Sequence, residues 1–227
     1  MNFLRFLVLS FLVAGNLSAQ TPKAKAGTRQ ECGLPVNQVL RCPKFGFTYQ
    51  VIFGWVDRTA DMQQDEILPD ESASESSKET NPADHTQPAS SNSSKTLLAV
   101  FERPPAAPGE TINSAVVIAA EPLANYHGIK TAADYLNPIN ELAQNRGFKV
   151  VNEPYEFAVG PKQLARADFS KDRGKLTMWQ SSLVMIEKGN IVSFTFIGGS
   201  EDEVNDLISR LVFRGTRSNS QIPKDKK

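Results

Sequence analysis

The chain has 227 residues, of which 40% are hydrophobic and 22% are charged, and its 25 Lys and Arg residues balance 25 Asp and Glu residues. This length and this hydrophobic share fit one or two domains with a packed core. A formal charge of zero excludes the strongly basic surface typical of nucleic-acid binding, so no nucleic-acid partner is expected. Two Cys and two His residues leave too few ligands for a zinc or iron–sulfur site, so neither a cofactor nor a metal is expected.

The N-terminus has the pattern of a secretory signal peptide over residues 1–19. Arg5 precedes the apolar block Phe6–Ala14, and Leu17-Ser18-Ala19 offers a small-residue cleavage site before Gln20. A membrane-spanning helix needs about 20 apolar residues, so this block is too short for an anchor. We expect a secreted or periplasmic protein that is cleaved after Ala19 and has no stable membrane insertion.

Export determines how the two cysteines are interpreted. Cys32 and Cys42 are the only pair in the chain, and an even number of cysteines in an oxidising compartment favours a disulfide. The closed loop is short, and such a bridge stabilises a fold by roughly 3 kcal/mol. A reactive pair is the alternative, but redox pairs are normally spaced as Cys-x-x-Cys. The spacing here favours a structural bridge.

Composition divides the rest of the chain into a single domain over residues 31–215, a polar, flexible lead-in over 20–30 and a basic, flexible tail over 216–227. An acidic, Ser-rich insert interrupts the domain at residues 61–94, with eight carboxylates against the single Lys78. Between Pro69 and Ser94 there is no Leu, Ile, Val or Phe, so this stretch cannot bury enough surface to offset its ordering entropy. We expect the insert to be disordered; an acidic tail that binds calcium or a partner is the alternative.

Seven runs of apolar, aromatic or β-branched residues predict strands. They are Phe45–Val56, Thr96–Phe101, Ile112–Ala120, Phe148–Val151, Gln163–Phe169, Lys175–Ile186 and Ile191–Ile197. Turn residues at Asp172-Arg173-Gly174 and around Gly189-Asn190 join the last strands into hairpins.

Two segments predict helices. The first begins near Thr131 and ends at Gly147, and Pro138 inside it predicts a kink or a break after Asn137. The second begins at Ser200, whose spacing to Glu203 is that of a reciprocal cap, and ends at Gly215. Its apolar stripe consists of Val204, Leu207, Ile208, Leu211 and Val212. Hairpins with helices at two separate points predict an α+β fold, a mostly antiparallel sheet with helices packed on its faces.

This layout resembles the PsbP-like superfamily of α/β/α sandwiches, which includes extrinsic photosystem proteins, a Ran-binding nuclear import factor and exported bacterial proteins. The similar features are the strand Phe47–Val51 running into Gly54-Trp55, the helix Thr131–Arg146, the hairpin Trp179–Ile197 and the closing helix Glu203–Phe213. The chain departs from the family at Phe53, where many members carry Pro. The resemblance implies a non-enzymatic adaptor or binding role and assigns no functional residue.

Catalytic motifs were sought in the sequence and none was found. There is no Gly-x-Ser-x-Gly elbow, zinc-protease helix, phosphate loop, dinucleotide fingerprint or calcium loop. His85 falls in the acidic insert, which leaves His127 as the one imidazole that could act in a site. Four carboxylates of the folded part are available as partners, namely Glu102, Glu121, Glu153 and Glu156. The prediction is therefore that no residue is catalytic.

The sequence favours an exported, non-catalytic binding or accessory domain whose partner is an unknown protein or a small apolar ligand. Two alternatives stay open. One is a hydrolase-type extracytoplasmic enzyme whose site assembles from scattered acidic residues and His127, and a pocket that holds a carboxylate beside this imidazole would favour it. The other is a carrier of an apolar ligand, which a large dry cavity between sheet and helix would favour.

Overall fold

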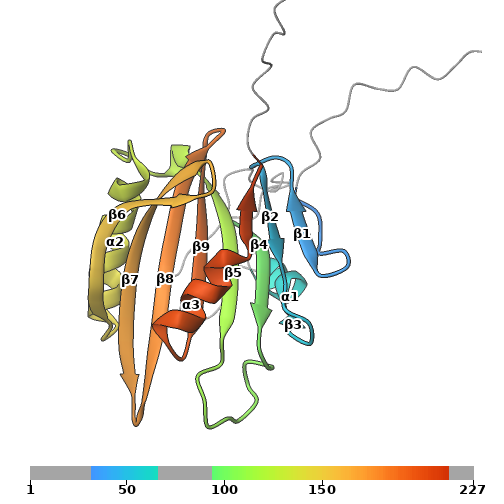
Figure 1. The fold of residues 1–227 in the computed structure, drawn as a ribbon. Coiled ribbons are helices and arrows are strands. Elements are labelled where there is room, and N and C mark those ends of the chain that lie inside the picture. Colours follow the sequence, from blue (N-terminus) through green and yellow to red (C-terminus); the bar gives the residue numbers. More distant parts are fainter. Residues whose placement is uncertain (1–31, 66–93, 215–227) are drawn as a thin grey trace, which may run out of the picture.

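The structure is a computed structural model, and it describes residues 32–65 and 94–214. The predicted signal peptide, the lead-in over 20–30, the tail over 216–227 and residues 66–93 of the predicted insert lie outside the described residues. The described part is built from two antiparallel sheets and three α-helices (Figure 1).

The larger sheet has seven strands in the order β3-β4-β5-β9-β8-β7-β6, and every neighbouring pair is antiparallel. Its strands are β3 (Val56–Asp57), β4 (Lys95–Phe101), β5 (Ala115–Pro122), β6 (Lys149–Val159), β7 (Lys162–Arg173), β8 (Leu176–Glu187) and β9 (Asn190–Gly198). β6 to β9 form a continuous meander because each pair is joined by a turn of two residues. The expected α+β class is confirmed.

The smaller sheet has three strands in the order β1-β2-β10: β1 (Val39–Cys42), β2 (Phe47–Gln50) and β10 (Leu211–Phe213). Its side chains alternate between the two faces. One face is buried against the larger sheet and carries Leu40, Phe47, Tyr49, Leu211 and Phe213. The other face carries Arg41, Thr48 and Val212 in one row across the three strands, and Val212 is 53% exposed.

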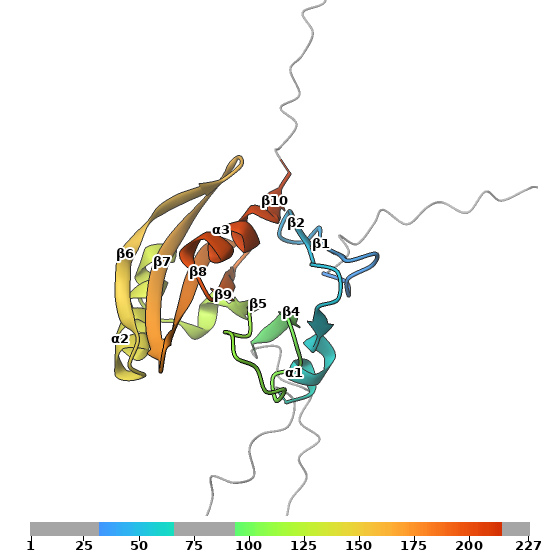
Figure 2. The same cartoon turned by 60° about the horizontal axis from the view of Figure 1, so that its bottom comes forward.

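The described part has three layers, with elements on both faces of the larger sheet (Figure 2). Helix α2 (Ala132–Asn145) covers one face of the larger sheet and packs on residues such as Phe169 and Val184. Helix α3 (Glu201–Ser209) and the smaller sheet cover the opposite face, around Phe194 and Phe196. Helix α1 (Thr59–Asp65) lies beside β4. The result is the α/β/α sandwich that the resemblance implies.

Helix α1 corrects the predicted boundary of the acidic insert. Residues 61–65 are helical and are not part of a disordered stretch. The reason is local, because Asp57 Oδ1 accepts from the Thr59 amide and hydroxyl and so fixes the helix start. The side chain of Gln63 then donates to the main-chain oxygen of Thr96 at 2.6 Å, which ties the helix to β4.

Helix α2 begins as predicted, because Thr131 and Asp134 form a reciprocal capping box. Of the predicted kink or break after Asn137, the break is wrong, since the helix runs without interruption from Ala132 to Asn145 with Pro138 inside it. Leu136, two residues before the proline, is fully buried, and its packing on the sheet holds the helix together across the missing amide.

Helix α3 is shorter than the sequence predicted. It ends at Ser209 and not at Gly215, and the next residues form β10. Val204, Leu207 and Ile208 keep their place on the buried helix face. Leu211 is buried on a strand, while Val212 points outward, so the predicted stripe of five residues holds for three. The spacing of apolar residues by three and four positions cannot show that the chain leaves the helix and pairs with β2 as a strand.

The remaining differences concern strand ends. The predicted strand Phe45–Val56 is divided into β2 and β3 by a turn at Phe53-Gly54, where Gly54 has a φ of +83°. The β8–β9 turn is centred on Lys188-Gly189, one residue earlier than predicted, and both residues have positive φ as a type I′ turn requires. β6 extends eight residues beyond Val151, since its exposed edge position gives it little apolar periodicity.

The two ends of the larger sheet differ in what they carry. At one end, Lys162, Glu187, Asn190 and Pro122 lie in one row, close to the start of β4. The chain enters and leaves the described part at this end, because Cys32 is bonded to Cys42 and the amide of Arg214 donates to Gly46. At the opposite end lie the loop between β4 and β5, the β7–β8 turn and the start of α3 (Figure 1).

Candidate functional site

An open hollow of about 410 Å³ lies at the end of the sheet away from the chain termini. Three segments form it: the loop between β4 and β5, the start of β8 and the start of α3. Its walls consist of Glu102, Thr111, Ile112, Ser114, Leu176, Thr177, Gly199, Ser200 and Glu203. The volume falls within the range of about 300–1,000 Å³ that is usual for ligand sites.

The loop over residues 102–114 is held by its own hydrogen bonds. The side chain of Asn113 accepts from the amide of Arg103 at 3.1 Å and donates to its main-chain oxygen at 3.0 Å, so it imitates a strand neighbour. The guanidinium of Arg103 donates to the hydroxyl of Thr111 at 3.1 Å and to its main-chain oxygen at 2.5 Å. These bonds fix the wall of the hollow that the loop provides.

The opposite wall is fixed by Glu203 in the first turn of α3. One oxygen of its carboxylate accepts from the hydroxyl of Ser114, which is only 1% exposed. The other accepts from the amide of Gly199 at 2.8 Å. A Cβ at residue 198 would lie 3.1 Å from the Glu203 carboxyl carbon, so Gly198 leaves room for the carboxylate in this position. The carboxylate thus joins α3 to the end of the loop between β4 and β5.

The cap of α3 differs from the predicted one in one detail. The hydroxyl of Ser200 accepts from the amide of Glu203 at 3.1 Å, as expected for a helix cap. The returning bond from the Glu203 carboxylate goes to Gly199 and not to Ser200. This displacement by one residue leaves the carboxylate within reach of Ser114.

The chemistry of the hollow is that of a recognition surface. Its walls carry two carboxylates, four hydroxyl groups and the apolar side chains of Ile112 and Leu176. None of the nine lining residues is cationic. Such walls can accept and donate hydrogen bonds, attract positive charge and cover an apolar group of moderate size.

A second polar cluster is buried nearby, on the face of the larger sheet that α3 covers. Arg166 and Asp168 of β7 form an ion pair with 2.8 Å between Nε and Oδ1, and each residue is 5% exposed. The guanidinium also donates to the hydroxyl of Ser181 and to the side chain of Asn205 on α3. The guanidinium of Arg166 also makes a cation–π contact with Phe157, with 4.8 Å between the guanidinium carbon and the ring centroid.

Two residues of β6, where the pairing with β7 is irregular, complete this cluster. Asn152 and Tyr155 both donate to Oδ2 of Asp168 at 3.0 Å. In a regular strand these two residues would point to opposite faces, but the register of β6 shifts between them. Burial, followed by the negative charge of Asp168, raises the pKa of the Tyr155 hydroxyl to about 12. The carboxylate of Asp168 thus accepts four hydrogen bonds, from Arg166, Ser181, Asn152 and Tyr155, which suits a structural role.

A cavity of about 10 Å³ lies between this cluster and α3, lined by Val151, Asp168, Trp179, Gln180, Ser181, Glu201 and Val204. Its volume is close to the smallest that holds one water molecule. It has no room for an apolar ligand, so it does not provide the large cavity that a carrier of such a ligand requires.

The residues singled out from the sequence are dispersed over the structure. Among them, Glu102 lines the hollow. His127 is exposed next to the short 3-10 helix η2 (Leu123–Asn125), whose amide at Leu123 donates to Gly189 at the opposite end of the sheet. Within residues 32–65 and 94–214, no hydrogen bond or ion pair joins His127 to a carboxylate, whereas His85 lies outside these residues.

The other three carboxylates have separate surroundings. Glu121 accepts from the hydroxyls of Tyr126 and Tyr135. Glu153 accepts from the side chain of Asn140 at 2.5 Å, and Glu156 is exposed on β6. The part of the chain that the structure describes contains no group of three His, Cys, Asp or Glu residues arranged to hold a metal ion.

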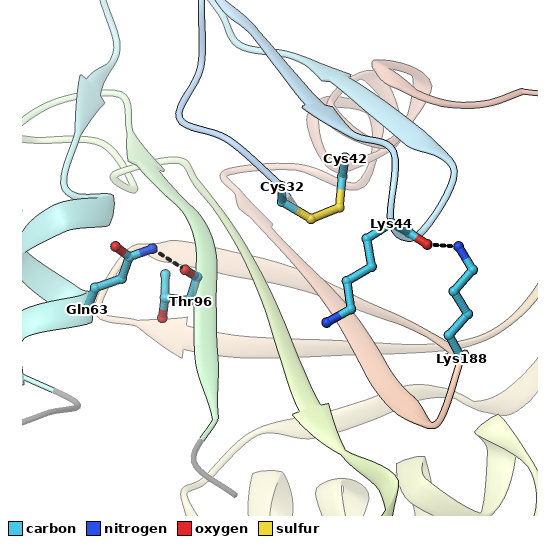
Figure 3. Close-up of a disulfide and its surroundings, with 6 residues drawn as sticks. All are labelled: Cys32, Cys42, Lys44, Gln63, Thr96 and Lys188. Carbon is cyan, nitrogen blue, oxygen red and sulfur yellow. Dashed lines mark hydrogen bonds between the residues drawn. A yellow bond between two sulfur atoms is a disulfide. The ribbon is translucent and has the colours of Figure 1, made fainter. Parts of the chain in front are cut away.

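Cys32 and Cys42 form a disulfide with 4.1 Å between their Cα atoms (Figure 3). The bridge lies next to the β1–β2 turn, where the ammonium of Lys188 donates to the main-chain oxygen of Lys44. It fixes the first described residue to the smaller sheet, at the end away from the hollow. In the described ranges, no helix is long and apolar enough to span a membrane.

Sequence reasoning missed Ser114, Gly199, Arg166 and Asp168. Only the last two left a signal, since they are charged residues at inward positions of a strand that also carries the buried Leu164. Ser114 and Gly199 act through contacts with Glu203, and residues 114 and 203 are 89 positions apart.

No family model and no curated protein matches the chain. Solved structures that are similar to it include the following three. A protein of unknown function from Pseudomonas aeruginosa, PA94, described as a putative regulator, is 17% identical with a TM-score of 0.35, over 49% of this chain and 80% of the other. LpqN of Mycobacterium tuberculosis, described as involved in cell envelope biogenesis, is 14% identical with a TM-score of 0.34, over 52% of this chain and 72% of the other.

The third is the cyanobacterial PsbP protein, CyanoP, of Synechocystis sp. PCC 6803. It is 13% identical with a TM-score of 0.39, over 83% of this chain and 100% of the other. A PsbP protein is thus among the solved structures that are similar to this chain. These likenesses concern architecture alone and assign no activity.

Proposed function

We propose that the chain is an exported, non-catalytic binding or accessory domain that takes its partner in the hollow at the start of α3. The observation that carries the proposal is the hollow itself, about 410 Å³ in volume and bounded by walls that are already hydrogen-bonded. Preorganised walls favour binding because little side-chain entropy is lost when a partner arrives.

The arrangement of Glu203 supports recognition in preference to catalysis. Both of its oxygens accept hydrogen bonds from the protein, from Ser114 and Gly199, so the carboxylate is occupied in holding two elements together. His127 lies near the opposite end of the sheet and has no access to the hollow. A general base must reach the proton that it removes, which this separation prevents.

Export is part of the proposal. It is supported by the signal-peptide pattern of residues 1–19 and by the pairing of Cys32 with Cys42. The bridge lies at the end of the sheet away from the hollow, so the two features are separate.

A comparison of two variants in a capture experiment tests the site. The mature protein, immobilised through its C-terminus, captures partners from its own extracytoplasmic fraction, and the captured material is quantified. Leu176→Arg places a long charged side chain in the hollow at a position that is already 38% exposed, so the fold should tolerate it. Val212→Arg makes the same kind of change on the outer face of the smaller sheet.

Capture that is lost with Leu176→Arg and kept with Val212→Arg supports the hollow as the binding site. Capture that survives Leu176→Arg contradicts the proposal, provided that circular dichroism shows both variants folded.

A further inference from the structure

On the basis of the proposed binding role, we infer that the hollow recognises a Lys or Arg side chain carried by an extended segment of a partner polypeptide. The inference rests on the charge, the apolar surface and the hydrogen-bonding groups that the walls combine.

Charge is the first step. Glu102 and Glu203 lie on two walls of one hollow, and Glu201 and Asp202 extend the negative surface along the first turn of α3. The guanidinium of Arg103 donates to Thr111 and also forms an ion pair with Glu102, with 3.4 Å between Nη1 and Oε2. This pair offsets the charge of Glu102, so the excess of negative charge at the hollow comes from Glu203, with Glu201 and Asp202 beside it.

The apolar wall is the second step. Ile112 and Leu176 line the same hollow as the carboxylates. A Lys or Arg side chain has an aliphatic stem that covers apolar surface while its charged end reaches a carboxylate. A bare metal ion would leave this apolar surface unused, and a neutral apolar ligand would gain nothing from the negative charge of the hollow.

The hydroxyl groups are the third step. Thr111, Thr177 and Ser200 surround the hollow and can bond to the amides of an extended backbone. The volume of about 410 Å³ admits one long side chain together with the adjoining backbone. The side of the hollow that faces solvent leaves a path for the rest of the polypeptide.

The test uses capped tripeptides as probes, so that the side chain is their only charge. Acetyl-Ala-Lys-Ala-amide and acetyl-Ala-Arg-Ala-amide are titrated into the ¹⁵N-labelled mature protein, and acetyl-Ala-Gln-Ala-amide serves as the neutral probe. We expect the two cationic probes to shift the amide resonances of Thr111, Thr177 and Gly199, the neutral probe to shift them much less, and added salt to weaken the effect.

The matched pair of variants lies in one loop. Glu102→Gln removes a lining carboxylate, whereas Glu110→Gln makes the same change at an exposed residue that does not line the hollow. Glu102→Gln should weaken binding of the cationic probes about two- to five-fold, as expected for a partly exposed ion pair, and Glu110→Gln should not.

Equal binding of the neutral and cationic probes in the hollow would overturn this inference while leaving the proposed function in place. Shifts that are reproduced by magnesium or calcium ions alone would also overturn it, because the carboxylates would then act as a metal site. Loss of the proposed function itself would appear in the other experiment, as partner capture that survives Leu176→Arg.

Discussion

The hydroxyl of Ser114 donates to the carboxylate of Glu203, although 89 positions separate the two residues in the chain. Ser114 ends the loop between β4 and β5, and Glu203 lies in the first turn of α3. The bond therefore closes one side of the hollow and at the same time attaches the helix to the sheet. The same carboxylate therefore shapes the hollow and holds two elements of the fold together.

Glu203→Ala should lower the free energy of unfolding by about 1–3 kcal/mol, because it leaves the buried hydroxyl of Ser114 without its acceptor. Asp202→Ala is the control, since Asp202 occupies the same first turn but is exposed. Urea unfolding of both variants measures the difference. Equal losses would mean that both residues stabilise the fold only through the helix dipole. The bond between Glu203 and Ser114 would then contribute nothing to the free energy of unfolding.

Leu207→Ala should cost about 2–5 kcal/mol, the usual range for a buried leucine, because this side chain is 2% exposed beneath α3. Val212→Ala should stay within about 0.5 kcal/mol of the wild type, since the residue points to solvent from β10. Thermal or urea unfolding compares the two. A large cost at Val212 would restore the longer helix that the sequence predicted.

The sequence was sufficient for the fold class and for most strands, because alternation along buried strands such as β9 is strong. It failed where a neighbour in space decides the local structure. Pro138 is tolerated because Leu136 holds α2 on the sheet, and Leu211–Phe213 form a strand because β2 offers them a partner. The hollow was beyond prediction, since its walls come from three segments that only the folded sheet brings together.

Asp168→Ala should destabilise the fold by about 3–5 kcal/mol, because it leaves the buried guanidinium of Arg166 without its counter-charge. The control is Asp172→Ala on the same strand, where the ion pair with Lys149 is exposed and its loss should matter little. Chemical unfolding gives both values. Similar small effects at both positions would show that water or other groups replace the carboxylate of Asp168.

The raised pKa of Tyr155 predicts that the fold loses stability at alkaline pH. Its hydroxyl has a pKa of about 12, raised from 10.0 first by burial and then by the charge of Asp168. The native state therefore holds this proton more tightly than the unfolded state, and the contribution is complete below pH 10.0 and is lost as the pH rises toward 12. Tyr155→Phe should flatten this part of the stability profile, and urea unfolding across the interval measures it. An unchanged profile would contradict the account of this hydrogen bond.

Replacement of residues 66–93 by a short Gly-Ser linker should leave the melting temperature nearly unchanged, because Gln63 and Thr96 are hydrogen-bonded and bring the two attachment points together. Extending the deletion to residues 61–94 should lower it, since Gln63 and most of α1 are then removed. Differential scanning calorimetry separates the two. Equal melting temperatures would show that α1 contributes nothing to the fold.

The most direct test of the hollow as the binding site is a chemical-shift map of the ¹⁵N-labelled mature protein saturated with its captured partner. The account predicts that the largest changes fall on Thr111, Thr177 and Gly199, at the end of the sheet away from the disulfide. Changes concentrated instead on Arg41, Thr48 and Val212, the outer row of the smaller sheet, would contradict it.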